Sequence, residues 1–126
     1  MKNYVDTGAF LAVQAAGAAV LDRAEPLAAG YVKQFQERRD AMVRALAAHG
    51  FDAPTPRATM YLWIPLPDGV QSWGFQRRAL EEAGVVTLAG SNFGSGGEGF
   101  VRLALTVATP RLLEASERLG RILAAV

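Results

Sequence analysis

The chain contains no cysteine, one histidine and two lysines among its 126 residues. The lack of cysteine excludes a disulfide framework, a thiolate nucleophile and any cysteine-based metal site. With a single histidine, a metal would depend on carboxylates. These are dispersed along the chain, so we expect no metal site. The absence of cysteine fits a reducing compartment, and we expect a cytoplasmic protein.

Neither sign of charge dominates, because 13 Lys and Arg residues face 12 Asp and Glu residues. This balance lacks the basic excess of nucleic-acid-binding proteins, so nucleic acid is not an expected partner. The most apolar run, Ala9–Leu21, is about 13 residues long, whereas a transmembrane helix needs roughly twenty. No basic leader with a small-residue cleavage site is recognisable, so we expect neither a signal peptide nor a membrane partner.

Hydrophobic residues make up 51% of the chain, which is typical of one globular domain of this length. The periodicity predicts elements in the order α-α-β-α-β-β-α, an α+β fold in which two helices precede a small three-stranded sheet covered by helices. The expected helices cover residues 9–23, 26–48, 72–83 and 109 to the end, and the expected strands cover 59–64, 85–88 and 100–107.

Several helix ends carry recognisable signals. Ser72 and Thr109 are expected N-caps, and Pro110 suits a first helical turn. His49 and Gly50 form an expected C-terminal signal, because glycine adopts the left-handed cap and a protonated histidine favours the helix dipole. Pro26 suits the start of the second helix, so we divide the chain into a helical segment, 1–25, and a domain, 26–126.

Arg102 is the one charge in an otherwise apolar strand. Alternation places Val101, Leu103, Leu105 and Val107 on the buried face and Arg102 on the opposite face. A half-buried guanidinium needs a carboxylate or phosphate partner, best in a bidentate pair. An internal carboxylate such as Glu98 and a bound ligand remain equal alternatives.

The segment before this strand has five glycines between Gly90 and Gly99. It lacks the Gly-Lys-Ser/Thr of a phosphate-binding P-loop and opens no helix, so it is not a dinucleotide fingerprint. A plain connector is the simpler interpretation, and a loop that forms the wall of a ligand site is the alternative.

The remaining reactive residues do not form a catalytic set. His49 is expected to end a helix, and Lys2 and Lys33 are expected to be solvated rather than to form Schiff bases. Glu81 and Glu82 are expected on a solvated helix face.

Four segments in order resemble the C-terminal small domain of class I and II aminotransferases, pyridoxal-phosphate enzymes of the aspartate aminotransferase type. They resemble the family patterns F-x-x-R-R-D, A-x-Y-x-W-x-x-x-P, P-G-x-x-F-G and G-x-G-x-x-R-x-x-L. In this chain they are Phe35–Asp40, Thr59–Pro67, Ala89–Gly94 and Gly97–Leu105. The third segment departs from the pattern, because Ala89 replaces the usual proline.

The resemblance implies that Arg102 binds the α-carboxylate of the amino acid or 2-oxo acid substrate. The loop at Ser91–Gly94 would line the same cleft, which makes Asn92 a second substrate-binding candidate, and Thr59–Tyr61 would flank the substrate side chain. The segment 1–25 would lead from the large domain of such an enzyme.

The family's cofactor-binding features are missing from the sequence. The large domain of these enzymes carries a Schiff-base lysine in an S-K-x-x-x-x-G-x-R stretch, which has no counterpart here. We therefore expect the chain alone to bind no pyridoxal phosphate and to be inactive. The alternative is a stand-alone, non-catalytic module that binds a carboxylate or a protein. In both cases we expect apolar surface that meets a large domain or drives self-association into a dimer or larger oligomer.

Overall fold

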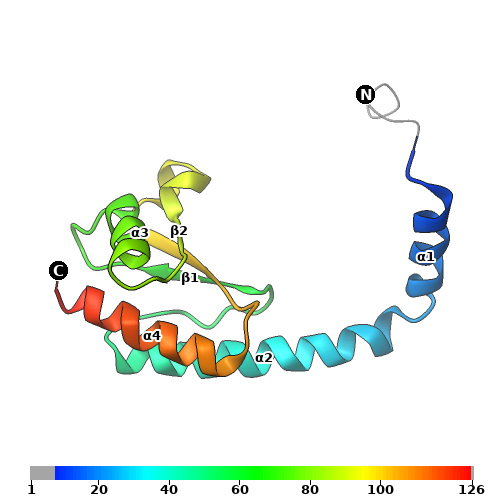
Figure 1. Ribbon diagram of the computed structural model, residues 1–126, viewed down its shortest axis with the longest axis horizontal. Coiled ribbons are helices and arrows are strands. Elements are labelled where there is room, and N and C mark those ends of the chain that lie inside the picture. The colour runs from blue at the N-terminus through cyan, green and yellow to red at the C-terminus, as the bar shows by residue number, and fades with distance from the viewer. Residues whose placement is uncertain (1–7, 126) are drawn as a thin grey trace. The chain divides into compact units, whose positions relative to one another are not determined.

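A computed structural model of the chain describes residues 8–125. Its helices and strands follow the predicted order, which confirms the α+β fold (Figure 1). The helices are α1 (Leu11–Leu21), α2 (Ala24–Ala48), α3 (Ser72–Glu81) and α4 (Thr109–Leu123); the strands are β1 (Tyr61–Pro65), β2 (Leu88–Ala89) and β3 (Phe100–Ala104). No helix in this range is long and apolar enough to cross a membrane.

The chain divides into two compact units inside α2, between Gln34 and Phe35. Within the described residues, the first unit contains α1 and the start of α2. None of the residues of α1 is buried, so its alanine-rich sequence supplies helix propensity without a packed core. Whether residues 1–25 lead from another domain stays a prediction.

The second unit is built on an antiparallel sheet with the strand order β1-β3-β2. Buried side chains alternate along the two longer strands, with Leu62 and Ile64 in β1 and Val101 and Leu103 in β3. They share one core with buried residues of three helices: Met42 and Leu46 of α2, Phe75 and Ala79 of α3, and Leu112, Leu119 and Ile122 of α4. The helices therefore cover one face of the sheet, as predicted.

The strands are shorter than expected, for identifiable reasons. Gly84, at φ +64°, ends the turn after α3, and the amide of Val85 donates to the carbonyl of Ala79 at 2.8 Å. Val85 therefore completes a helix C-terminus instead of starting a strand. β3 ends at Ala104, so Val107 is 43% exposed and does not join the buried face.

Two predicted N-caps are also wrong. α3 begins at Ser72 itself, and α4 begins at Thr109, with no side-chain cap bond at either end. The hydroxyl of Ser72 is instead buried against residues distant in the chain. Pro110 does lie in the first turn of α4, as expected.

Candidate functional site

Arg102 lies in the middle of the central strand. It pairs with Trp63 of β1 on one side and with Leu88 of β2 on the other. Its neighbours along β3, Val101 and Leu103, point into the core, so alternation directs the Arg102 side chain to the opposite face of the sheet. The predicted placement of Arg102 is therefore correct.

Aromatic rings surround the guanidinium. Its Cζ atom lies 4.2 Å from the ring centroid of Tyr61 and 4.6 Å from that of Phe93. Trp63 meets Phe93 edge-on at 5.6 Å and stacks on Phe100 at 5.7 Å. We call Tyr61, Trp63, Phe93, Phe100 and Arg102 the Arg102 face. Rings at these distances attract the cation and restrict its rotamers, while the N–H groups at the edge of the plane still donate.

The internal partner considered for Arg102 is not used. Glu98 accepts hydrogen bonds from Ser72 instead, at 2.7 Å from the amide and 3.0 Å from the hydroxyl. Within residues 8–125, the side chain of Arg102 forms no hydrogen bond or ion pair with another residue. The guanidinium is thus held by aromatic contacts, and its planar set of donors is unpaired among the described residues.

The glycine-rich segment contributes to this face. It forms two short 3₁₀ turns, Gly90–Phe93 and Ser95–Gly97, and the first turn carries Phe93 to Arg102. Asn92 precedes Phe93, is exposed, and forms no side-chain hydrogen bond within the described residues. The role of Asn92 in substrate binding stays a prediction.

The Glu98 contacts have an electrostatic consequence. The amide of Ser72, then its hydroxyl, favour the charged carboxylate of Glu98 and hold its pKa below the usual glutamate value. The hydroxyl of Ser91 lies 2.9 Å from that of Ser72 and hydrogen-bonds to it. One buried serine therefore connects α3 to both ends of the glycine-rich segment.

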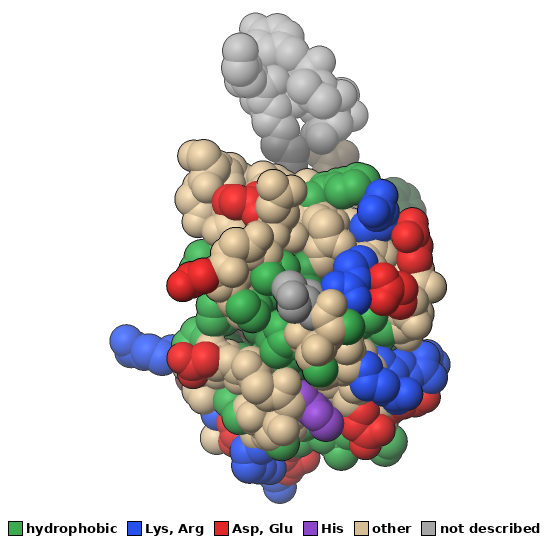
Figure 2. Space-filling view, turned by 90° about the vertical axis from the view of Figure 1, so that its left-hand side faces the viewer, with side chains coloured by type: hydrophobic (Ala, Val, Ile, Leu, Met, Phe, Trp, Pro, Cys, Tyr) green, Lys and Arg blue, Asp and Glu red, His purple; other side chains and the backbone are tan. Residues whose placement is uncertain are grey.

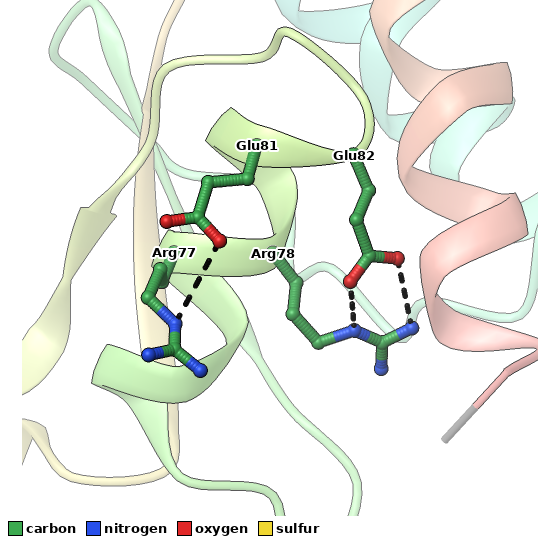
Figure 3. Close-up of polar contacts among 4 residues, drawn as sticks. All are labelled: Arg77, Arg78, Glu81 and Glu82. Carbon is green, nitrogen blue, oxygen red and sulfur yellow. Dashed lines mark hydrogen bonds and ion pairs between the residues drawn. The ribbon is translucent and has the colours of Figure 1, made fainter.

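The glutamates at the end of α3 form ion pairs within the chain. Glu81 and Glu82 pair with Arg77 and Arg78, one helical turn earlier on α3 (Figure 3). The hydrogen bond from Arg78 is the main cause of a lowered Glu82 pKa. On the face in Figure 2, charges of both signs alternate around hydrophobic side chains, which matches the balanced composition. Among residues 8–125, no cluster of three metal-ligating side chains occurs.

His49 follows the end of α2, and its side chain packs against Gly120 of α4. Gly50, at φ +87°, terminates the helix as predicted, and the amide of Phe51 donates to the carbonyl of Leu46. Gly120 supplies the space for the imidazole, so His49 contributes to helix packing as well as to the helix end.

The charged motif at the centre of α2 has a role that sequence reasoning missed. Arg38 donates to the carbonyl of Leu105, just beyond β3, at 3.0 Å, and Arg39 donates to the carbonyl of Pro56 at 3.2 Å. Asp40 accepts from Arg39 at 2.7 Å. The Arg39 bond holds the proline-rich connector that precedes β1, and the Arg38 bond holds the end of β3. β1 and β3 carry Tyr61 and Arg102 of the Arg102 face.

Comparison with known proteins identifies the family. The model of the family described as aminotransferase class I and II matches residues 3–119. The chain belongs to the class I and II aminotransferases. It is 42% identical over 126 residues to LL-diaminopimelate aminotransferase of Moorella thermoacetica, covering 100% of this chain and 32% of that protein. The Aquifex aeolicus enzyme of the same name is 42% identical over 122 residues, with 97% and 32% covered.

Solved structures show the same relationship to this aminotransferase chain. A probable N-succinyldiaminopimelate aminotransferase from Thermus thermophilus superposes with a TM-score of 0.88 at 38% identity, over 95% of this chain and 32% of the other. LL-diaminopimelate aminotransferase from Chlamydomonas reinhardtii gives 0.79 at 30% identity, over 91% and 28%. The chain spans about a third of the length of these relatives.

Aminotransferases of this family depend on pyridoxal phosphate, which these enzymes bind through a lysine. The described part of the chain contains one lysine, Lys33, which is exposed on α2 and forms no hydrogen bond or ion pair within residues 8–125. The described residues therefore do not fit the lysine-bound cofactor. The chemistry that follows concerns Arg102 and the residues around it.

Proposed function

We propose that this chain is the small domain of a pyridoxal-phosphate aminotransferase and that Arg102 binds the α-carboxylate of its amino acid or 2-oxo acid substrate. The observation that carries the proposal is the guanidinium itself. It is central in the sheet, held by two aromatic rings and free of internal ion pairs among the described residues. A fixed fork of donors orients a carboxylate in a way that a mobile lysine does not.

Orientation is what the Arg102 face contributes to amino-group transfer. A carboxylate bound by two parallel hydrogen bonds has its α-carbon placed relative to the sheet, which lowers the entropic barrier to reaction. The relatives named LL-diaminopimelate aminotransferases make that dicarboxylic diamine the first substrate to test.

The test is a titration of the chain with LL-diaminopimelate, followed through the NMR signals of the arginine side chains. We expect Arg102 to shift and Arg102→Lys to bind about tenfold more weakly, equivalent to about 1.4 kcal/mol. Arg111→Lys is the matched control, because Arg111 is exposed on α4 and its side chain forms no hydrogen bond or ion pair within residues 8–125. Cadaverine, the diamine without carboxylates, should not shift Arg102. Equal binding by both variants would contradict the proposal.

We infer that the chain does not transaminate by itself, because the described residues lack the lysine site. Transaminase activity of the purified chain with added pyridoxal phosphate, abolished by Arg102→Ala, would contradict this inference. Mixing the chain with a relative that lacks the matched third of its sequence provides the complementary test. Restored transamination supports an enzyme domain, whereas LL-diaminopimelate binding without restoration supports a stand-alone carboxylate-binding module.

The partner surface is proposed to include α1. The side chains of Phe10, Leu11 and Leu21 are 75%, 76% and 75% exposed. An apolar helix of this kind gains free energy when another surface covers it. We propose that it docks on a large aminotransferase domain or, without one, on a second copy of this chain.

A further inference from the structure

The segment from Gly90 to Gly99, which we call the glycine loop, is closed at its base by two glycines. A Cβ atom on Gly90 would collide with the carbonyl oxygen of Gly97, and a Cβ on Gly97 would collide with that of Gly90. Both residues are buried. The two ends of the loop therefore touch through backbone alone, and Phe93 lies in the part between them.

A second set of contacts fastens the loop to α3. Glu98 lies at the end of the loop and accepts from the amide and the hydroxyl of Ser72, at 2.7 Å and 3.0 Å. The hydroxyl of Ser91, which lies at the other end, is 2.9 Å from that of Ser72 and donates to it, because the single Ser72 hydroxyl hydrogen goes to Glu98. Because Ser72 is fully buried in the first turn of α3, it is a rigid anchor for both ends of the loop.

The anchored loop carries the ring that contacts Arg102. Phe93 is 51% exposed, so core packing does not hold it in place. Its contacts are Arg102 at 4.6 Å and the edge of Trp63 at 5.6 Å. Two explanations for its position compete: the Trp63 contact alone, or the fastening of the loop on Ser72. An exposed aromatic pair is only weakly stabilising, and this is small against the conformational freedom of a glycine-rich backbone.

We propose that Glu98 is a positioning residue for Arg102: through Ser72 and Ser91 it fastens the glycine loop so that Phe93 stays against the guanidinium. The carboxylate touches no part of Arg102 and acts through the loop. This inference rests on the proposed function for its biological meaning, because an ordered guanidinium matters where a carboxylate binds. Its physical content is the position of Phe93, which is measurable without any ligand.

The charge of Glu98 makes the fastening dependent on pH. The carboxylate form accepts both Ser72 bonds, and these bonds lower its pKa. The contribution of Glu98 to holding the loop is complete above the ordinary glutamate pKa of about 4.3. It is lost as the pH falls through the lowered pKa of Glu98 in the folded chain. Asp68 is the other titratable residue lining the surface hollow beside Glu98. The Arg102 face adds two ionisable side chains, those of Arg102 and Tyr61.

The experiment measures the ring-current displacement of the Arg102 side-chain NMR signals in the free chain at neutral pH. Phe93→Ala defines the part of the displacement that Phe93 causes. We expect Glu98→Ala to remove at least half of that part, and Ser72→Ala to change it in the same direction. Glu81→Ala is the control, since Glu81 is an exposed glutamate whose one ion pair within residues 8–125 is with Arg77. It should leave the signals unchanged.

Acidification provides the readout that a general loss of stability would not reproduce. In the unmodified chain and in Asp68→Asn, the Arg102 signals should move toward the Phe93→Ala position below the ordinary glutamate range. In Glu98→Ala this step should be absent. Circular dichroism at each pH confirms that the fold persists. If Glu98→Ala unfolds, Ser72→Ala takes its place at neutral pH and should remove at least half of the displacement that Phe93 causes. Signals unchanged in the folded variants would overturn the proposal and leave Trp63 as the group that holds Phe93. Failure to bind LL-diaminopimelate would contradict only the proposed function.

Discussion

At the scale of single residues, alternation predicted the face of Arg102 but not its surroundings. The sequence offered Glu98 as an internal partner because it is a nearby carboxylate. The structure uses Tyr61 and Phe93 instead, which lie about forty and nine positions away in the chain. Period-two patterning indicates which way a side chain points, whereas contacts across the sheet depend on register and loop geometry. Tyr61 reaches Arg102 through the pairing of β1 with β3.

Thr59 is the residue with the clearest backbone strain. It has φ +81° just before β1, the one positive value at a non-glycine position in residues 8–125. The left-handed conformation costs a β-branched residue about 1–2 kcal/mol. Replacement by glycine relieves this strain, but the larger conformational entropy of glycine in the unfolded state cancels about half of the gain. We expect Thr59→Gly to raise the free energy of unfolding by about 0.5–1 kcal/mol in urea denaturation. Thr55→Gly, at an exposed connector position without positive φ, should lower it slightly. Destabilisation by Thr59→Gly equal to that of Thr55→Gly would show that no strain is relieved.

At the scale of elements, the helices were predictable in existence and order, because hydrophobic periodicity reports them directly. Their ends were less predictable. Serine is a residue type that favours the N-cap position, yet the hydroxyl of Ser72 bonds to Glu98 and Ser91 rather than to its own helix. The choice depends on a glutamate that is distant in sequence, so local propensity alone does not reveal it. The same holds for Arg38 and Arg39, whose carbonyl partners lie in other elements.

The close approach within the glycine loop gives a matched pair of substitutions. Gly90→Ala places a Cβ against two backbone oxygens, those of Gly97 and Phe100, which cannot rotate away. We expect a loss of about 2–3 kcal/mol in unfolding free energy. Gly96→Ala, in the same loop, meets nothing within 4 Å and should be neutral or slightly stabilising. Equal effects in chemical denaturation would contradict the contact between the two ends of the loop.

Helix packing offers a second pair. Gly120→Ala improves helix propensity by about 1 kcal/mol but puts a Cβ within 2.7 Å of the Cβ of His49. We expect the clash to outweigh the propensity and lower the melting temperature. Gly74→Ala in α3 has open space around it, so it should raise the melting temperature. A higher melting temperature for Gly120→Ala would mean that His49 moves aside at little energetic cost.

At the scale of the whole molecule, the order of elements, the three-stranded sheet and the family were all recoverable from the sequence. The α+β fold follows from the order and periodicity of the elements, and the family follows from four motifs in order, confirmed by the match over residues 3–119. The closed glycine loop and its anchor on Ser72 were not recoverable, because they depend on backbone geometry between Gly90 and Gly97 and on a side-chain contact between Ser72 and Glu98, 26 residues apart. Hydrophobic periodicity likewise does not indicate which partner the chain binds.

Self-association is the prediction that belongs to this scale. The exposed apolar side chains of α1 include Val13 and Val20, 61% and 53% exposed, which lie two turns apart on one face. We expect sedimentation equilibrium of the isolated chain to show a mass that rises with concentration, since covering these side chains removes apolar area from water. Val13→Glu with Val20→Glu should shift the chain toward monomer, because association would then bury two unpaired carboxylates. Ala15→Glu with Ala18→Glu adds the same charge to the opposite face of α1 and should have the smaller effect. A monomer at every concentration would contradict the prediction. Equal effects of the two double variants would mean that the added charge, rather than loss of the valine contact, reduces association.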